Sequence, residues 1–350
     1  MEGTLFVLPL LLLYEVLCGS LWLGSPLDDP SLVRNADKYV NVSYYYGPPG
    51  TMAHLMFDTY GFRSPGKDVS NVDFLTIGSS TTLQDQITEG ETWQDIIQDS
   101  FARDGKKVTV VNAGVDAQST RGYIRNFELW FPHVPGLRAH YVLVYLGVED
   151  LLTATSNQPY RAEMDRLSVR RTLSGYLTTK SAIYRLAYGI FATWLAQAVR
   201  NGGQQRIEFT SAKWTSIPLQ QDLPRLLHAA TAEYAARLRV LAEKIRGFGA
   251  VPVYVVEPEG AFRGQGAKLV GLVDSIEVNG LRYNGMDLYQ ATRLMAEATR
   301  SVSKEVGAPF IDVAQDMEFD LGDFYDFHHN TPAGIRKIGG YLYSKLKGLL

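Results

Sequence analysis

The chain has 350 residues, of which 46% are hydrophobic and 20% are charged, and its formal net charge is −3. This composition is typical of a globular protein with one sizeable core and excludes a disordered chain. The small net charge offers no electrostatic basis for binding nucleic acid, which we therefore do not expect as a partner. The single cysteine, Cys18, excludes a disulfide bond within the chain and does not assign a cellular compartment.

Residues 1–24 contain a hydrophobic segment, in which Pro9 and Glu15 interrupt an otherwise largely apolar run. The run approaches the length of about 20 residues that a membrane-spanning helix needs. We therefore expect an anchor or signal segment, with membrane contact through residues 4–23, in a protein that is membrane-anchored or exported to the periplasm or cell envelope. The alternative is a buried core helix. Because the first basic residues follow the segment, the positive-inside rule favours a cytoplasmic body, and the topology stays open.

The rest of the chain divides into an irregular lead-in and one domain. Residues 25–70 are rich in Pro, Gly, Asp and Tyr and show no sustained period, which is typical of irregular structure. In residues 71–350, short β-branched or aromatic runs alternate with longer stretches whose apolar residues recur at helical spacing. Strands are predicted at 72–77, 107–111, 141–146, 251–256 and 309–312. Helices are predicted at 91–103, 120–130, 224–246, 286–306 and 332–349.

This alternation predicts an α/β fold with three αβα layers, in which helices cover both faces of a five-stranded parallel sheet. Functional loops of such sheets lie at the carboxyl ends of the strands. The stretch at about 151–223 departs from the alternation, and we interpret it as an insertion. Its apolar run at 182–199 predicts either a core helix or a helical cap that covers the site or contacts a membrane.

Two distant segments carry the candidate chemistry. Ser80 lies in IGSSTT, on the turn that ends the first strand of the domain, and Asp326 and His329 lie in FYDFHHNTPAG before the last helix. A serine hydroxyl becomes a good nucleophile when an imidazole takes its proton and a carboxylate orients that imidazole. Each segment alone is weak evidence, because Ser, Asp and His also cap helices. The adjacent His328 is the alternative imidazole.

With these residues in view, the chain resembles the SGNH/GDSL serine hydrolases over about residues 58–348. Four segments carry the resemblance in the family's order: IGSSTT, VVNAGVDAQST, LVYLGVEDLL and FYDFHHNTPAG. Upstream, TYGFR resembles a lead-in of exported, often membrane-anchored members. The resemblance implies a flavodoxin-like SGNH hydrolase fold in which Ser80 is the nucleophile, His329 the general base and Asp326 the carboxylate that orients it.

The resemblance also implies an oxyanion hole at Ser80, Ala117 and Glu149, and two of these positions depart from the family's pattern. Ala117 stands where the family has glycine, and its backbone N–H survives that change unless the site needs a positive φ, which alanine resists. Glu149 stands where the family has asparagine. An ionised carboxylate cannot donate a hydrogen bond to an oxyanion, whereas a protonated one in an apolar pocket can. We expect an active enzyme with an altered oxyanion hole.

The function implied is that of a carboxylic ester hydrolase acting on acyl esters of carbohydrate or lipid, either small molecules or a polysaccharide. The alternatives are an O-acyltransferase that modifies a polysaccharide and a non-catalytic binding module of the same fold. No cofactor or metal is expected, because the six histidines lack the spacing of metalloprotease ligands and no phosphate-binding loop is present. The glycine-rich segment at 260–271 lacks the strand placement that a dinucleotide site needs.

Overall fold

A computed structural model describes residues 2–18, 27, 32–152, 181–184, 187, 206–264, 266–278 and 280–350. The side chains of residues 2–8, 18, 149, 152 and 267 lie outside this description.

The centre of the domain is a parallel sheet with the strand order β12-β7-β5-β3-β4. The chain enters at β3, moves to the edge strand β4, and then crosses back to continue through β5 and β7 to β12. The order therefore reverses between β3 and β5, and ligand crevices form at such switch points, outside the carboxyl ends of the strands. The strands are β3 (Val72–Ile77), β4 (Val110–Asn112), β5 (Ala139–Leu146), β7 (Val251–Val256) and β12 (Phe310–Asp312).

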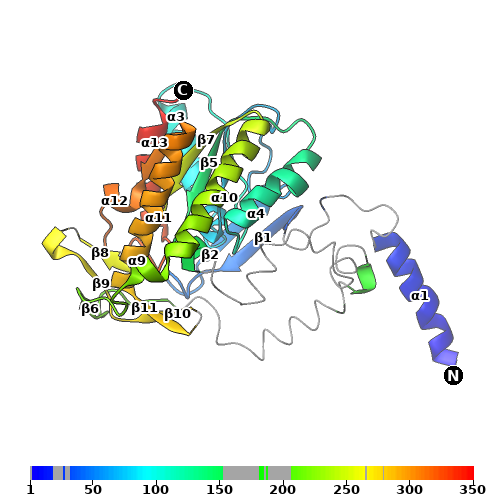
Figure 1. Cartoon of the computed structure of the whole chain (residues 1–350). Helices are drawn as coiled ribbons and strands as arrows, with labels where there is room; N and C mark the ends of the chain where they lie inside the picture. The colour runs from blue at the N-terminus through cyan, green and yellow to red at the C-terminus, as the bar shows by residue number, and fades with distance from the viewer. Residues whose placement is uncertain are drawn as a thin grey trace.

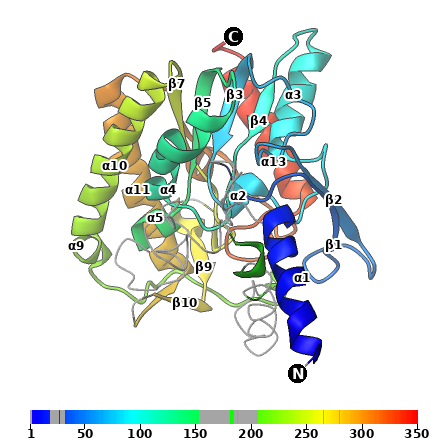
Figure 2. The ribbon, with the colours of Figure 1, turned by 90° about the vertical axis from the view of Figure 1, so that its right-hand side faces the viewer.

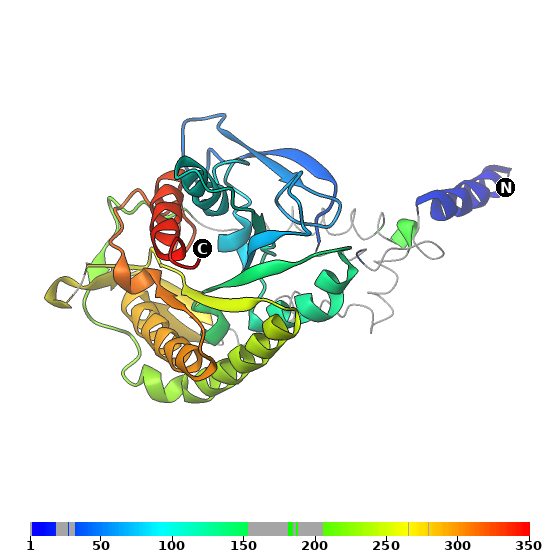
Figure 3. The same cartoon turned by 90° about the horizontal axis from the view of Figure 1, so that it is seen from above.

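Helices cover both faces of this sheet, as Figures 1 and 3 show. One face carries α3 (Trp93–Arg103) and α13 (Pro332–Leu346), whose apolar side chains share a core with the sheet. The other carries α4 (Thr120–Arg125), α10 (His228–Gly247) and α11 (Gly285–Val306). The predicted αβα class and five-stranded parallel sheet are confirmed.

The predicted elements match the observed ones closely. β3 and β7 begin and end at the predicted residues. The stretch predicted as one helix at 224–246 is divided at Leu227 into α9 (Leu223–Leu226) and α10. The helix predicted at 120–130 is α4 followed by a π-helical turn (Asn126–Trp130) and a 3-10 turn (Phe131–His133). Short helices α2 (Ser80–Leu83), α5 (Glu149–Leu152) and α12 (Val313–Asp316) follow β3, β5 and β12.

The lead-in at 25–70 was expected to be irregular, and that prediction is wrong for two segments of six residues each. It contains an antiparallel hairpin of β1 (Ala36–Asn41) and β2 (Met52–Phe57), with Ala36 paired to Phe57. Every second side chain of β2 points inward and packs beside Leu83 of α2. Figure 2 shows the hairpin beside the β3–β4 side of the domain. The hairpin therefore packs against the turn that carries Ser80.

Most of the insertion expected at about 151–223, including most of the predicted cap helix at 182–199, lies outside the described residues. Its last part contributes β6 (Trp214–Thr215) to a small antiparallel sheet with β8 (Phe262–Arg263) and β9 (Val270–Leu272). A 3-10 turn (Gly266–Lys268) lies between β8 and β9 in the sequence. A second hairpin joins β10 (Ser275–Val278) to β11 (Leu281–Asn284). Figure 1 shows these small sheets below the central sheet, at the edge where its strands end.

The N-terminal hydrophobic segment forms helix α1 (Glu2–Cys18), which extends away from the domain in Figures 1 and 3. Large apolar side chains are exposed along it, Leu17 by 73%. Glu15, which interrupts the apolar run, accepts hydrogen bonds from the Ser181 hydroxyl and from the backbone N–H groups of Ala182 and Ile183. Among the described helices, none combines the length and the apolar character needed to cross a membrane.

Candidate active site

Ser80 stands on a tight turn that only a glycine-containing sequence can form. β3 ends at Ile77, Gly78 follows, and α2 begins at Ser80. A Cβ on Gly78 would lie 2.0 Å from the Thr82 hydroxyl oxygen, and a Cβ on Gly114 would lie 2.4 Å from the backbone nitrogen of Leu83. The loops after β3 and β4 therefore touch backbone to backbone. This close packing fixes the turn that presents the Ser80 hydroxyl.

Arg63 of the lead-in holds the far end of this turn. Its buried guanidinium donates hydrogen bonds to the backbone carbonyl oxygens of Leu83, Gln84 and Ile87. Leu83 ends α2 and Gln84 is its C-cap, a position at which carbonyl groups lack partners within the helix. Burial lowers the pKa of Arg63, and the nearby carboxylate of Glu89 opposes that shift. The lead-in segment thus acts as a structural clamp on α2.

The structure brings Ser80, His329 and Asp326 together in one hydrogen-bonded series. The Ser80 Oγ lies 2.8 Å from Nε2 of His329, and Nδ1 of His329 lies 2.7 Å from Oδ2 of Asp326. The relative exposures of Ser80, His329 and Asp326 are 9%, 6% and 4%. Both ring nitrogens of His329 are therefore engaged, one by a hydroxyl and the other by a carboxylate. This is the arrangement in which an imidazole takes a serine proton.

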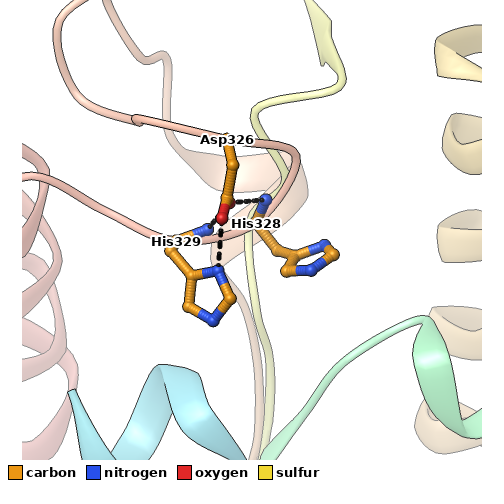
Figure 4. Close-up of side chains that lie close together, drawn as sticks. All are labelled: Asp326, His328 and His329. Carbon is orange, nitrogen blue, oxygen red and sulfur yellow. Dashed lines mark hydrogen bonds and ion pairs between the residues drawn. The ribbon is translucent and has the colours of Figure 1, made fainter. Parts of the chain in front are cut away.

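Asp326 is held in place by the loop that carries it. Its Oδ1 accepts the backbone N–H groups of His328 at 3.0 Å and of His329 at 2.7 Å (Figure 4). Burial raises the pKa of Asp326, but the hydrogen bond and the charge of His329 outweigh it and lower the pKa below its usual value. Asp326 is therefore a carboxylate at neutral pH, the form that orients an imidazole.

His328, the alternative imidazole, points elsewhere. Figure 4 shows its ring turned away from the Asp326 carboxylate, while the ring of His329 lies beneath that carboxylate. The Nδ1 of His328 lies 3.5 Å from a carboxylate oxygen of Glu259. The geometry therefore joins His329, and not His328, to Ser80.

The same loop contains donor atoms close enough to hold a metal ion. Asp326, His328 and His329 each offer one potential ligand atom, and these three atoms all lie within 4.8 Å of one another. Both oxygens of Asp326 already accept hydrogen bonds, and both nitrogens of His329 already face Ser80 or Asp326. These hydrogen bonds match the needs of proton transfer rather than of a dedicated metal centre.

The three residues expected at the oxyanion hole are Ser80, Ala117 and Glu149, and the structure describes the backbone of each. Ser80 is the first residue of α2, so its backbone N–H has no partner within the helix. The backbone of Ala117 has φ of 55°, in the left-handed region, and its N–H donates to no backbone acceptor within the described part of the chain. The side chain of Glu149 lies outside the described residues, and its backbone begins α5. Alanine thus occupies a conformation that glycine adopts more easily.

Replacing Ala117 with glycine is expected to stabilise the protein. The left-handed conformation costs an L-residue roughly 1–2 kcal/mol, and the greater freedom of glycine in the unfolded chain offsets about half of that gain. We expect an increase of about 0.5–1 kcal/mol in the free energy of unfolding, with no loss of activity. Urea denaturation of both proteins measures the difference. A destabilised Ala117→Gly variant would show that the observed φ carries no strain.

Two buried carboxylates near the nucleophile were not anticipated. Glu257 and Glu259 follow β7 and are each 3% exposed. Glu257 accepts a hydrogen bond from the Thr81 hydroxyl, and one of its oxygens fills the space that a side chain on Gly147 would need. The rule that sites form at strand ends would have identified both, because they directly follow the strand predicted at 251–256.

The chain is an αβα protein in which a serine, a histidine and an aspartate are hydrogen-bonded in series at the carboxyl edge of a parallel sheet. Residues 75–337 match the sequence model of the GDSL-like lipase/acylhydrolase family, and the chain belongs to that family. It is a carboxylic ester hydrolase. The predicted resemblance is confirmed.

The chain is similar to several solved structures at low sequence identity. No curated protein matches the chain. Among solved structures, the inhibitor-bound aryl esterase of M. smegmatis has 14% identity and a TM-score of 0.43, covering 80% of this chain and 100% of that one. A putative arylesterase from Agrobacterium tumefaciens has 16% identity and a TM-score of 0.42, covering 80% and 100%. Est24, a carbohydrate acetylesterase from Sinorhizobium meliloti, has 11% identity and a TM-score of 0.41, covering 80% and 100%.

Proposed function

We propose that the chain hydrolyses its ester through Ser80, His329 and Asp326. The observation that carries the proposal is the hydrogen-bonded series from the Ser80 Oγ through His329 to Asp326, at 2.8 and 2.7 Å. In the first step, the Ser80 Oγ attacks the ester carbonyl carbon while Nε2 of His329 takes the hydroxyl proton. His329 then gives that proton to the leaving alcohol. Asp326 orients the ring and stabilises the imidazolium.

The second step repeats the chemistry with water. Nε2 of His329 takes a proton from a water molecule, whose oxygen attacks the carbonyl carbon of the acyl-serine. The acid is released, and the proton returns to the Ser80 Oγ. In both steps the backbone N–H groups of Ser80 and Ala117 are proposed to stabilise the negative carbonyl oxygen. The free N–H at the start of α2 supports this role for Ser80.

The proposed substrates are acyl esters of carbohydrate or lipid, and the family's lipases and acylhydrolases support an acyl ester as the class. O-acyl transfer to a polysaccharide uses the same acyl-serine, which a sugar hydroxyl intercepts in place of water. Product analysis with a sugar acceptor present separates the two reactions. Hydrolysis releases the alcohol and the free acid, whereas transfer releases the alcohol and forms the acylated sugar.

Labelling with a fluorophosphonate tests the proposed nucleophile directly. The reagent forms a covalent bond only with a serine activated by a neighbouring base. Peptide mass spectrometry of the labelled protein is expected to find the adduct on Ser80. The adjacent Ser79 provides a matched control, because Ser79→Ala should be labelled at the wild-type rate. An adduct on Ser79 would reassign the nucleophile, and the absence of any adduct would favour a non-catalytic binding module.

The substitution Glu149→Asn tests the altered oxyanion hole. Asparagine restores the amide donor of the family's pattern, and one such donor contributes about 10²–10³ in rate. We expect kcat on a small activated ester at neutral pH to rise, by up to that factor. Rates measured across pH identify the alternative in which Glu149 is a neutral donor, because wild-type activity would then fall as pH rises. A tenfold or larger drop in the variant at neutral pH would contradict the idea that Glu149 limits catalysis.

A further inference from the structure

The ring of Tyr325 lies against the imidazole of His329. The two rings are nearly parallel, with an interplanar angle of 7° and centroids 5.6 Å apart. The Tyr325 N–H also donates a hydrogen bond to the His329 carbonyl oxygen at 3.0 Å. Tyr325 is only 3% exposed, so neither contact competes with solvent. His329 is thus held by Tyr325 through both its ring and its backbone.

Tyr325 is itself fixed from outside its loop. Its hydroxyl donates a hydrogen bond to Oε1 of Gln86 at 2.8 Å. The backbone carbonyl oxygen of Gln86 accepts the hydroxyl of Tyr46, and the ring of Tyr45 lies 4.9 Å from that of Tyr325. Burial, together with the nearby carboxylates of Asp326 and Asp85, raises the pKa of Tyr325 far above its usual value. The phenol therefore stays protonated and remains a donor.

These contacts connect the two halves of the site. Gln86 follows α2, the helix that begins with Ser80, and Tyr325 precedes Asp326. The hydroxyl of Tyr325 therefore ties the loop that carries His329 to the segment that carries Ser80. The parallel ring limits rotation of the imidazole out of the plane in which Nε2 faces the Ser80 Oγ. The centroid of the Tyr325 ring also lies within about 6 Å of the His329 ring, the distance at which an aromatic face attracts a cation such as imidazolium.

We propose that Tyr325 is a positioning residue for His329, which fixes the plane of the imidazole by stacking against it. The proposal rests on the proposed function, in which His329 is the base. Other titratable groups of the described chain face His329 from two elements. Asp326 and His328 lie in its own loop, with the His328 ring edge-on at 4.9 Å, and Asp85 follows α2. Substituting the uncharged Tyr325 leaves these charged groups in place.

The test compares Tyr325→Phe with Tyr325→Leu on a small activated ester. Phenylalanine keeps the stacked ring, whereas leucine removes it. A displacement on the order of 1 Å costs about 10²-fold in rate. We therefore expect kcat of Tyr325→Leu to fall about 10- to 100-fold with KM within twofold of wild type, and kcat of Tyr325→Phe to stay within about threefold. In the proton NMR spectrum, the downfield signal of the His329 Nδ1–H should be kept in Tyr325→Phe and broadened in Tyr325→Leu.

A buried tyrosine of the central sheet supplies the matched control. Tyr254 of β7 is fully buried, and its hydroxyl donates a hydrogen bond to the backbone carbonyl oxygen of Leu238 in α10. Tyr254→Leu should lower the melting temperature as Tyr325→Leu does and leave kcat unchanged. If Tyr325→Leu does not fold, Tyr325→Met fills similar space without a ring and carries the same test.

The outcomes separate the two proposals. A wild-type kcat in a folded Tyr325→Leu or Tyr325→Met variant overturns the positioning role, as does an equal loss of kcat in Tyr325→Phe. Ester hydrolysis that does not depend on Ser80 overturns the proposed function instead, whatever the Tyr325 variants show.

Discussion

Substitution of Ser80 by alanine is expected to reduce ester hydrolysis by a factor on the order of 10⁴–10⁶, the loss seen when a serine hydrolase loses its nucleophile. The variant has no Oγ to attack the carbonyl, and His329 has no hydroxyl proton to take. The fold should be unaffected, because the turn is set by close packing at Gly78 and Gly114 and by the hydrogen bonds of Arg63. Steady-state rates and thermal denaturation of the two proteins measure both effects.

Ser79→Ala provides the matched control for this experiment. Ser79 precedes α2, and its side chain makes no capping hydrogen bond to the helix backbone. Its replacement should leave kcat and the melting temperature close to those of wild type. If Ser79→Ala is inactive while Ser80→Ala retains activity, the proposed nucleophile is wrong. If both variants hydrolyse the ester at the wild-type rate, the reaction occurs elsewhere on the protein.

The sequence correctly predicted the strands that are buried on both faces of the sheet. β3 and β7 are covered by helices on both faces, so their residues form continuous apolar runs, whose ends are easy to place. β1 was missed for the opposite reason. All six of its side chains are exposed or half-buried, and the partner β2 lies beyond a turn rich in glycine and proline. Its pairing depends on contacts with Leu83, which the local sequence does not encode.

The candidate site shows the same division. Short motifs predicted the series of Ser80, His329 and Asp326, because each residue sits at a fixed offset from a strand end or a helix start. The choice between His329 and His328 required the observed hydrogen bonds. The contact of Glu257 with Thr81 joins residues that are 176 positions apart. The contact of Tyr325 with His329 lies within one loop and depends on how that loop is folded. Such contacts follow from the packed structure and not from any local pattern.

Replacement of Asp326 by asparagine should reduce kcat about 10⁴-fold while leaving the ester-binding surface intact. In the wild type, the Asp326 carboxylate accepts the Nδ1 proton of His329, which leaves Nε2 free to take the Ser80 proton. The amide of asparagine can present its N–H₂ group to Nδ1, which favours the tautomer with the proton on Nε2. That tautomer cannot act as the base. Normal KM with a greatly reduced kcat on a small activated ester is the expected signature.

Stability gives an independent check on the same carboxylate. The folded state lowers the pKa of Asp326 below its ordinary value of 3.8. The resulting contribution to stability is present at pH values above the unfolded pKa and is lost as pH falls through the folded pKa. The difference in melting temperature between the wild type and Asp326→Asn should therefore be constant near neutral pH and change only below about pH 4. A difference that changes between pH 6 and 8 would show that another group controls the titration of this site.

A kcat of Asp326→Asn within tenfold of wild type would remove Asp326 from the proposed mechanism. It would show that the imidazole of His329 keeps the required tautomer without a carboxylate partner.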